Sequence, residues 1–467
     1  MKNMWSAWRY LFKSSDIRRM LLVTFALLIL YRLAANVPVP GVDNAVLKAL
    51  HDKLTASGGN FLNFLDLLSG GTVSRFSVLS MGVYPYITAQ IILQLMIPII
   101  PSLQRRMDEN PTEGRKWMEK WTYYLTVPMA ALSAIGQVNI FNAYAQQAGL
   151  GTVLNFGFTP DPTTGSPDRI LASVTALLCM VAGTMFAIWL GELISEYGIR
   201  GQGLSLIIFA GIVARMPSNL ASIMGDEQNR WTMLTMMIVI IVLTIFAIVF
   251  VQQGRRNVPV MYPGKRVGNR MSMPVKASLP LMVNMAGMIP LIFASAILQF
   301  PTIISSFFLS PSTNPILLQI AQWIQSNLSG NNDSTTYWVI YFFMVVIFTF
   351  FYTDVLFTQQ NYGENLKRVG AQIPGVNRGA PTQKYLTKVQ RRITLPGALF
   401  LGIVAALPFV FSLLLKLVNI NTAASSSGLF LVSSAGLLIV VGVVRDTFST
   451  IDAELKLHGY QDSILVK

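Results

Sequence analysis

The sequence is poor in charge, cysteine and histidine. Only 12% of its 467 residues are charged, well below the ~25% that is typical of soluble domains. A soluble chain of this length would need more charge to cover its surface, which excludes an ordinary cytosolic enzyme. The single cysteine, Cys179, excludes a disulfide framework. With only two histidines, His51 and His458, we expect no metal site and no cofactor.

Apolar side chains are correspondingly abundant, at 53% of the chain, with 27 Phe, 15 Tyr and 8 Trp. This composition excludes disorder, because such side chains are buried when they can be. A membrane-spanning helix needs about 20 apolar residues. Ten stretches meet that need: residues 20–37, 76–100, 121–141, 170–190, 203–222, 231–252, 279–300, 337–358, 393–415 and 429–446. The predicted fold is an all-α polytopic membrane protein with ten transmembrane helices.

The positive charge is divided unequally between the two sides of this topology. Of 35 Lys and Arg residues, 27 fall on the side of the two termini, 7 on the other side, and Arg32 lies within the first span. The richer side comprises residues 1–19, 101–120, 191–202, 253–278, 359–392 and the tail from Arg445. Cytoplasmic segments carry the excess of Lys and Arg. We therefore predict a cytoplasmic N-terminus (1–19) and a cytoplasmic C-terminal tail (447–467).

The second and seventh spans share a sequence pattern. Residues 82–94 read GVYPYITAQIILQ and residues 287–299 read GMIPLIFASAILQ, with seven identities in thirteen. Each of these spans is the second in a set of five. Because five is an odd number, equivalent helices of the two sets cross the membrane in opposite directions. This is typical of an inverted repeat, in which the functional path lies between the two halves. The halves would be residues 20–222 and 223–446. A chance likeness of two proline-containing helices remains the alternative.

The repeated glycines and prolines suggest local roles within these two spans. We interpret Gly82 and Gly287 as sites of close helix approach, and Pro85 and Pro290 as sites that permit a kink.

The span interiors contain almost no ionisable residues. Arg32, Arg215, Asp354 and Arg445 lie near span ends, where their side chains can extend to the membrane surface. An ion-coupled secondary transporter needs polar ion ligands at mid-depth, and a membrane enzyme needs a nucleophile or a metal site. Neither set is visible, and we predict no catalytic residue. The chain is better explained as a passive conduit that a partner drives.

Two long stretches resemble the signatures of the SecY/Sec61α protein-translocation channel family. They are SVLSMGVYPYITAQIILQLM (77–96) and WLGELISEYGIRGQGLSLIIFAGI (189–212). Further segments follow the family in the same order: VPVPGVD (37–43), FLDLLSGG (64–71), LPLMVNMAGMIPLIFAS (279–295), NLKRVGAQIPG (365–375) and KVQRRITLPGAL (388–399). The resemblance covers nearly the whole chain and is of the bacterial type.

The resemblance implies a protein-conducting channel in the bacterial cytoplasmic membrane. Such a channel passes secreted polypeptides across the membrane and releases membrane proteins sideways into lipid, without catalytic activity of its own. The implied partners are SecE, SecG, the SecA ATPase, the ribosome through its RNA, the translocating polypeptide with its signal sequence, and membrane lipid.

The resemblance also implies a pore ring of aliphatic side chains from spans 2, 5, 7 and 10. The matching residues are Val83, Ile87, Leu204, Ile208, Ile292 and Ile439. Val83 and Ile87 are four residues apart, as are Leu204 and Ile208, so each pair shares one helix face. From their composition alone, these positions would be ordinary core residues.

Two further elements of the channel follow from the same resemblance. The amphipathic segment 61–75 matches the plug that closes the channel from outside, with Phe64, Leu65, Leu67, Leu68, Ser69, Gly70 and Gly71 as its residues. An interfacial helix is the alternative for this segment. Thr88, Gln94 and Asn284 match polar positions of the lateral gate. Hydrogen bonds between helices are worth about 0.6–2 kcal/mol each, and static helix contacts are the alternative role.

The two longest basic segments, 253–278 and 359–392, are predicted cytoplasmic loops. In the family such loops bind SecA or ribosomal RNA, and basic side chains suit an acidic partner. The candidate docking residues are Arg255, Arg256, Lys265, Arg266, Lys367, Arg368 and Arg378. Arg378 stands one residue away from the usual position of the family's loop arginine. The charge bias at span ends is the alternative explanation for some of these residues.

Overall fold

The computed structural model describes residues 15–43, 45–49, 76–103, 105, 111–147, 149–157, 168–224, 230–262, 266–267, 270–271, 275–306, 308, 315–328, 335–417 and 434–457. The helices are α2 (Ser15–Ala34), α5 (Tyr84–Ile99), α7 (Pro111–Gln147), α8 (Asp168–Tyr197), α9 (Gly203–Met224), α10 (Arg230–Gln253), α11 (Ile289–Ser306), α12 (Pro315–Leu328), α13 (Thr335–Gln359), α14 (Tyr362–Arg368), α15 (Ala380–Leu417) and α17 (Ser434–Leu457). The strands are β1 (Arg255–Tyr262), β2 (Arg266–Val267), β3 (Arg270–Met271) and β4 (Val275–Met282).

Each of the ten predicted apolar stretches contains one helix of the structure, and the predicted helical class is confirmed. These helices are α2, α5, α7, α8, α9, α10, α11, α13, α15 and α17. By length and composition, three helical stretches within the described ranges can cross a membrane: Thr112–Asn142, Arg169–Tyr197 and Thr335–Arg368. Shorter apolar helices occupy Tyr84–Ile97, Gly203–Ala214 and Ile241–Gln253.

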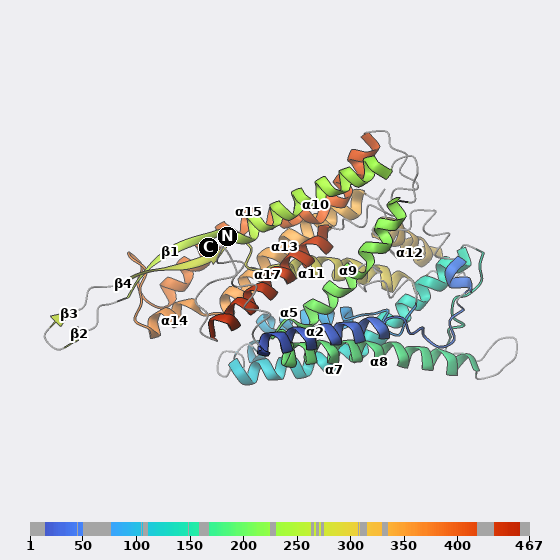
Figure 1. Cartoon of the computed structure of the whole chain (residues 1–467), viewed down its shortest axis with the longest axis horizontal. Coiled ribbons are helices and arrows are strands. Elements are labelled where there is room, and N and C mark those ends of the chain that lie inside the picture. The colour runs from blue at the N-terminus through green and yellow to red at the C-terminus, as the bar shows by residue number, and fades with distance from the viewer. Residues whose placement is uncertain are drawn as a thin grey trace.

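The helices form two layers that meet along the long axis of the molecule. Figure 1 shows α2, α7 and α8 side by side, with α8 in contact with both neighbours. The second layer contains α10, α13, α15 and α17, in which α13 contacts α15 and α17 contacts α10. Helix α9 contacts α8 on one side and α17 on the other. It therefore joins the N-terminal and C-terminal halves of the chain.

The predicted boundaries of two spans are wrong in the same way. The stretch expected as helix from residue 76 becomes helical only at Tyr84, and the stretch expected from residue 279 becomes helical only at Ile289. Residues 279–282 instead belong to β4, which pairs antiparallel with β1. Apolar composition predicted helix here, but β4 buries its apolar Leu281 in a small core.

The repeated glycines lie just before the first residues of their helices. Gly82 has φ +51° and Gly287 has φ +64°, both in the left-handed region. Helices α5 and α11 begin two residues after these glycines, at equivalent positions of the repeat. A Cβ at Gly287 would meet nothing within 4 Å, so backbone conformation rather than close approach requires glycine there.

The repeated prolines do not kink their helices. Pro85 and Pro290 are each the second residue of α5 and α11. In the first helical turn the N–H groups have no partner within the helix, so a proline is accommodated without a lost hydrogen bond. The predicted close approach at Gly287 and the predicted kinks at both prolines are therefore wrong, while close approach at Gly82 stays a prediction. The shared Gly and Pro define where each helix begins.

We predict that Gly287→Ala lowers stability by about 1–2 kcal/mol, because an L-residue pays this cost in the left-handed region. Gly287→Asn should lose less, since asparagine enters that region more readily. The measurement is the thermal-unfolding midpoint of the purified protein in detergent. The control is Gly442→Ala within α17, where the new Cβ meets Met288 Sδ at an ordinary 3.9 Å. Equal losses in both alanine variants would contradict the argument.

Candidate functional site

A cavity of about 430 Å³ lies between helices from both halves of the chain. Its wall includes four of the six predicted ring residues: Ile87 of α5, Leu204 and Ile208 of α9, and Ile292 of α11. Helices α8, α13 and α17 also contribute to the lining. The structure therefore brings side chains as far apart in the sequence as Ile87 and Asp446 to one cavity.

The other two ring residues lie in the apolar cluster next to the cavity. Val83 and Ile439 are buried there together with Ile208, and Ile87 and Leu204 contact the same cluster. The six positions thus converge from α5 and its cap, α9, α11 and α17. Such a group is wholly aliphatic, which makes it able to exclude water and ions while yielding to a larger chain.

Polar side chains line another part of the cavity. Gln90 and Gln94 come from α5, Ser195 from α8, and Ser205 from α9. These groups carry no charge and can donate and accept hydrogen bonds. Sequence reasoning missed the two serines, because no local pattern distinguishes a cavity-lining serine from one that faces another helix.

One ion pair lies in the cavity wall. Arg445 of α17 donates to Asp446 Oδ1 from Nε at 3.0 Å and from Nη2 at 2.8 Å. Both residues line the cavity. We expected Arg445 to extend toward the membrane surface, which stays a prediction, and the structure pairs it with the adjacent carboxylate. The pair keeps the local net charge of this wall at zero.

The three candidate gate residues make no cross-gate bond among themselves in the described structure. Thr88 Oγ1 donates to Tyr84 O at 2.9 Å within its own helix. Asn284 Oδ1 accepts from Gly287 N at 2.9 Å, and its Nδ2 donates to Gly287 O at 3.2 Å. Asn284 thus stabilises the turn that precedes α11.

Gln94 differs from the other two gate candidates. It lines the cavity, and its buried Oε1 has no hydrogen-bond partner among the described residues. An unpaired buried acceptor is costly, about 1–3 kcal/mol. This oxygen is therefore suited to accept a bond from whatever enters the cavity.

The two basic segments are folded, and they lie together at one end of the molecule. Strands β1 and β4 pair antiparallel from Arg255–Met282 to Tyr262–Val275. Met261 of β1 forms a two-bond bridge with Gln372, at 2.8 and 2.9 Å. Figure 1 shows the hairpin and α14 projecting beyond the helices at this end. Both segments contain secondary structure: the first holds the hairpin, and the second contains α14 and the start of α15. Their cytoplasmic location stays a prediction.

A small apolar core holds these basic segments in place. It contains Val258 and Val260 of β1, Leu281 of β4, Phe357 of α13 and Leu386 of α15. Burial alternates along β1, so Val258 and Val260 point into the core while Asn257 and Pro259 point outward. The hairpin is therefore fixed to the helices and does not depend on a partner for its shape.

The candidate docking side chains are exposed around this core. Arg255 and Arg256 begin β1, Lys367 and Arg368 end α14, and Arg378 precedes α15. Arg378 Nε donates to Gln372 Oε1 at 3.2 Å, which ties it to the same bridge that holds β1. Arg266 lies in β2, and Lys265 falls outside the described residues. We call the exposed side chains of Arg255, Arg256, Lys367, Arg368 and Arg378, together with that of Lys276 in β4, the basic face.

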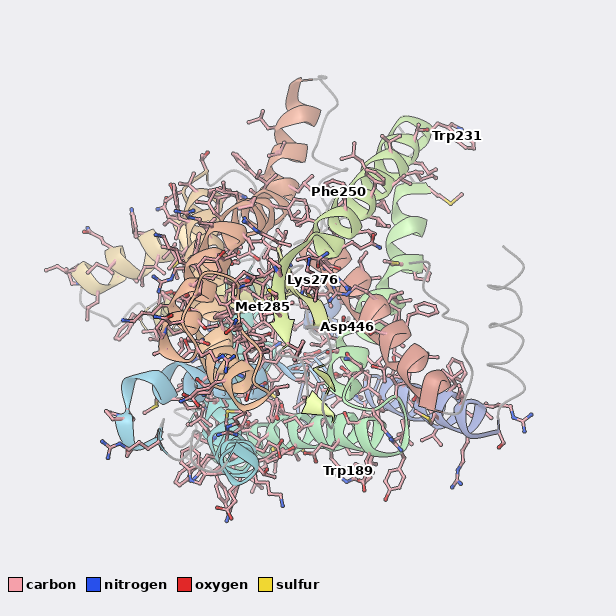
Figure 2. The ribbon with its side chains drawn as sticks, turned by 90° about the vertical axis from the view of Figure 1, so that its left-hand side faces the viewer. Trp189, Trp231, Phe250, Lys276, Met285 and Asp446 are labelled. Carbon is pink, nitrogen blue, oxygen red and sulfur yellow. The ribbon has the colours of Figure 1, made fainter. Side chains whose placement is uncertain are left out.

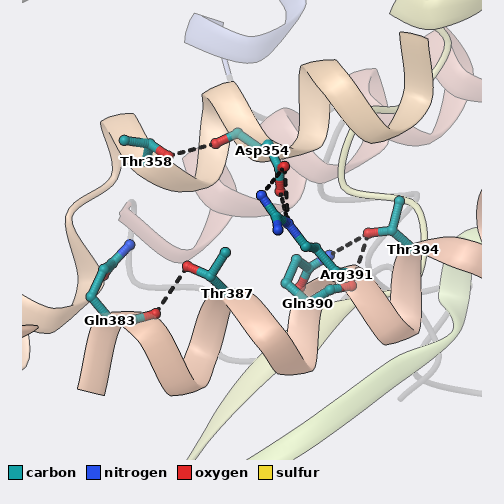
Figure 3. A network of polar contacts seen from close by, with 7 residues as sticks. All are labelled: Asp354, Thr358, Gln383, Thr387, Gln390, Arg391 and Thr394. Carbon is teal, nitrogen blue, oxygen red and sulfur yellow. Dashed lines mark hydrogen bonds and ion pairs between the residues drawn. The ribbon is translucent and has the colours of Figure 1, made fainter. Parts of the chain in front are cut away.

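Two charged residues nearby form a structural pair. Arg391 of α15 donates to both carboxylate oxygens of Asp354 of α13, with a shortest distance of 2.8 Å (Figure 3). Hydrogen bonding to Asp354 and its negative charge raise the pKa of the Arg391 guanidinium above its usual value. Our expectation that Asp354 extends toward the membrane surface stays a prediction. In the structure Asp354 links α13 to α15 through an exposed ion pair, and such pairs contribute about 0–1 kcal/mol.

The predicted plug segment 61–75, with Phe64, Leu65, Leu67, Leu68, Ser69, Gly70 and Gly71, lies outside the described residues. The predicted N-terminus up to residue 14 and the tail beyond residue 457 do as well. Within the described part of the chain, no three His, Cys, Asp or Glu side chains lie close enough to hold a metal ion.

The sequence of the chain was compared with those of known protein families and known proteins. The SecY family model matches residues 77–448. The chain belongs to the SecY family. It is 34% identical over 461 residues to the protein translocase subunit SecY of Streptomyces scabiei, covering 98% of this chain and 99% of that protein. It is 35% identical over 459 residues to the corresponding subunit of Aquifex aeolicus, with 97% and 98% covered.

Solved structures agree with the fold at lower identity. One is a protein-conducting channel with a TM-score of 0.59, at 17% identity, covering 96% of this chain and 95% of the other. Another is a SecY protein whose plug domain stabilises the closed channel, with a TM-score of 0.58, at 16% identity and the same coverage. Members of this family are membrane-embedded channels and not enzymes. The predicted family and fold are confirmed.

Proposed function

We propose that this chain is the pore-forming subunit of a Sec protein translocase. The observation that carries the proposal is the convergence of six aliphatic side chains, from both halves of the chain, beside one cavity. The relatives that match nearly the full length are named protein translocase subunit SecY, which supports the same conclusion. The substrate would be an unfolded polypeptide, which crosses the membrane through the ring.

The ring and the cavity would act in sequence on that polypeptide. Uncharged groups such as Gln90 and Ser205 offer hydrogen bonds to a polypeptide backbone without selecting its side chains. The aliphatic ring closes around the polypeptide and excludes ions because an apolar constriction loses its water. Nothing in this arrangement supplies energy, so the driving force comes from a partner.

The proposed orientation places the basic face in the cytoplasm. The excess of Lys and Arg on the side of both termini supports this topology. The two halves, residues 20–222 and 223–446, would cross the bacterial cytoplasmic membrane five times each. The inverted repeat is supported by Gly82 and Gly287, which precede α5 and α11 at equivalent positions and share a left-handed conformation.

The partners would be SecA or a ribosome at the basic face, with SecE and SecG beside the helices. The exposed Arg256, Lys276 and Arg368 gather positive charge on a rigid platform, which suits ribosomal RNA or acidic side chains of a motor. Spans 2 and 3 against spans 7 and 8 would form the lateral gate to lipid for signal sequences. Segment 61–75 would be the plug.

The direct test of the proposed function is reconstitution of the chain with SecE into liposomes. With SecA, ATP and a preprotein added outside, we expect the preprotein to become protected from protease. Protection should disappear without ATP or without this chain. Absence of protection, together with ion-driven uptake of a small solute, would instead support a secondary transporter.

The proposed pore ring predicts a specific change in ion permeability. Ile87→Gly with Ile292→Gly removes two side chains from the cavity wall, so resting ion conductance of proteoliposomes should rise several-fold. The matched control is Ile91→Gly with Leu298→Gly, on the same two helices. These residues are buried at 3% and 5% exposure and do not line the cavity. Equal conductance in both double variants would show that Ile87 and Ile292 do not form the barrier to ions.

The basic face predicts a salt-sensitive interaction. Arg256→Glu with Arg368→Glu should weaken SecA binding on the order of tenfold, or about 1.4 kcal/mol, at low salt. The difference should shrink at high salt, because ions screen exposed charges. The control is Lys116→Glu with Lys120→Glu on α7, which changes the net charge equally. Equilibrium binding to proteoliposomes measures both, and a similar loss in the control would contradict a defined docking face.

A further inference from the structure

Helix α12 has an exposed surface that divides into two strips. Ile316, Ile320 and Trp323 are spaced i, i+4 and i+7, so they share one side of the helix. They are exposed at 70%, 50% and 57% respectively. Gln319, Gln322 and Ser326 are spaced i, i+3 and i+7 and are also exposed, on a different side. The helix has no charged residue among its 14.

A third side of α12 faces the protein. Ala321 is buried there at 2% exposure. Gln325 Nε2 donates to Thr302 O at 3.2 Å and to Ser305 Oγ at 3.1 Å, both near the end of α11. Leu328, seven residues after Ala321 on the same side, packs against an apolar cluster of the bundle. The larger set of apolar side chains, Ile316, Ile320 and Trp323, nevertheless points away from the bundle. Exposure of this set to water would be unfavourable, so the orientation of α12 suits an apolar environment outside the protein.

Exposed apolar side chains also lie on the neighbouring helices. Helix α12 contacts both α11 and α13. Val339, Phe343 and Ile347 form an exposed apolar row along α13, and Ile304 is exposed near the end of α11. In Figure 2, the gold α12 projects sideways from the bundle when the molecule is viewed along its long axis. The helix therefore lies across the direction of the spans.

The geometry points to α12 as an interfacial helix that lies in the plane of the membrane surface. Its Ile316–Ile320–Trp323 strip enters the acyl chains, and its Gln319–Gln322–Ser326 strip faces the headgroups and water. A helix with separate apolar and polar sides and a tryptophan is suited to this boundary. Through the bonds of Gln325, the same helix holds the end of α11, whose other end borders the cavity.

Spin labels can test this placement without any measurement of translocation, so its outcome is independent of the proposed function. Replacing the only cysteine by Cys179→Ser gives a background for single labels. The paired variants are Ile320→Cys with its control Gln322→Cys, both at exposed positions. Ile316→Cys and Gln319→Cys form a second pair one turn earlier. All are reconstituted in phosphatidylethanolamine and phosphatidylglycerol liposomes.

The labels at 320 and 316 should collide several-fold more with oxygen, which enters lipid, than with an aqueous nickel chelate. The labels at 322 and 319 should show the reverse preference. Equal nickel access on both strips would place α12 in water and overturn the inference. Low access to both reagents at 320 and 316 would mean that protein, such as a second copy of the chain, covers the strip. That outcome would overturn it as well.

Discussion

The structure depends on an apolar contact between its two halves. Val83, Ile208 and Ile439 come from the segments that meet beside the cavity, and they are buried against one another. In a membrane, lipid is as apolar as these side chains, so helix association gains little from the hydrophobic effect and relies on close packing. Under the proposed function, this contact would exclude ions while closed. It would also cost little to separate, because a passing polypeptide would replace one set of apolar contacts with another.

Several polar interactions link other parts of the molecule, whereas the Arg445–Asp446 pair lies in the wall of the cavity itself. Asp354 and Arg391 fasten α13 to α15, and Asn284 stabilises the turn before α11. The basic face rests on its own small core around Val258 and Leu281. The hairpin and its helices are thus held by their own core, whereas the contact between the two halves is mainly apolar. Under the proposed function, the hairpin end would transmit the force of a partner and the apolar contact would open to the polypeptide.

Sequence patterns predicted much of this arrangement. Apolar length located ten helices, because membrane-spanning helices need long runs of such residues. The repeat between 82–94 and 287–299 predicted equivalent positions, and the structure gives both segments the same left-handed glycine. The resemblance to a known family named the six ring residues, which converge beside the cavity. Composition alone would not have separated them from other core residues.

Other features needed the tertiary structure. The hairpin of β1 and β4 was predicted as a loop and part of a span, since local apolarity does not reveal strand pairing between residues 255 and 282. Asp354 and Arg391 are 37 positions apart, so only folding could show that they pair. The same is true of α12, whose two exposed strips have meaning only once Gln325 shows which side faces α11.

The sequence by itself determined the helical class, the ten apolar stretches and the division of charge, because these follow from composition and short-range periodicity. The tertiary structure decided where each helix begins, which side chains border the cavity and which basic residues remain free to face a partner. Those features arise from contacts between distant segments. A local pattern cannot specify them, because apolar and polar residues of the same type occur in a core, at the contact between the two halves and on the surface. Only the neighbours that folding brings together distinguish these positions.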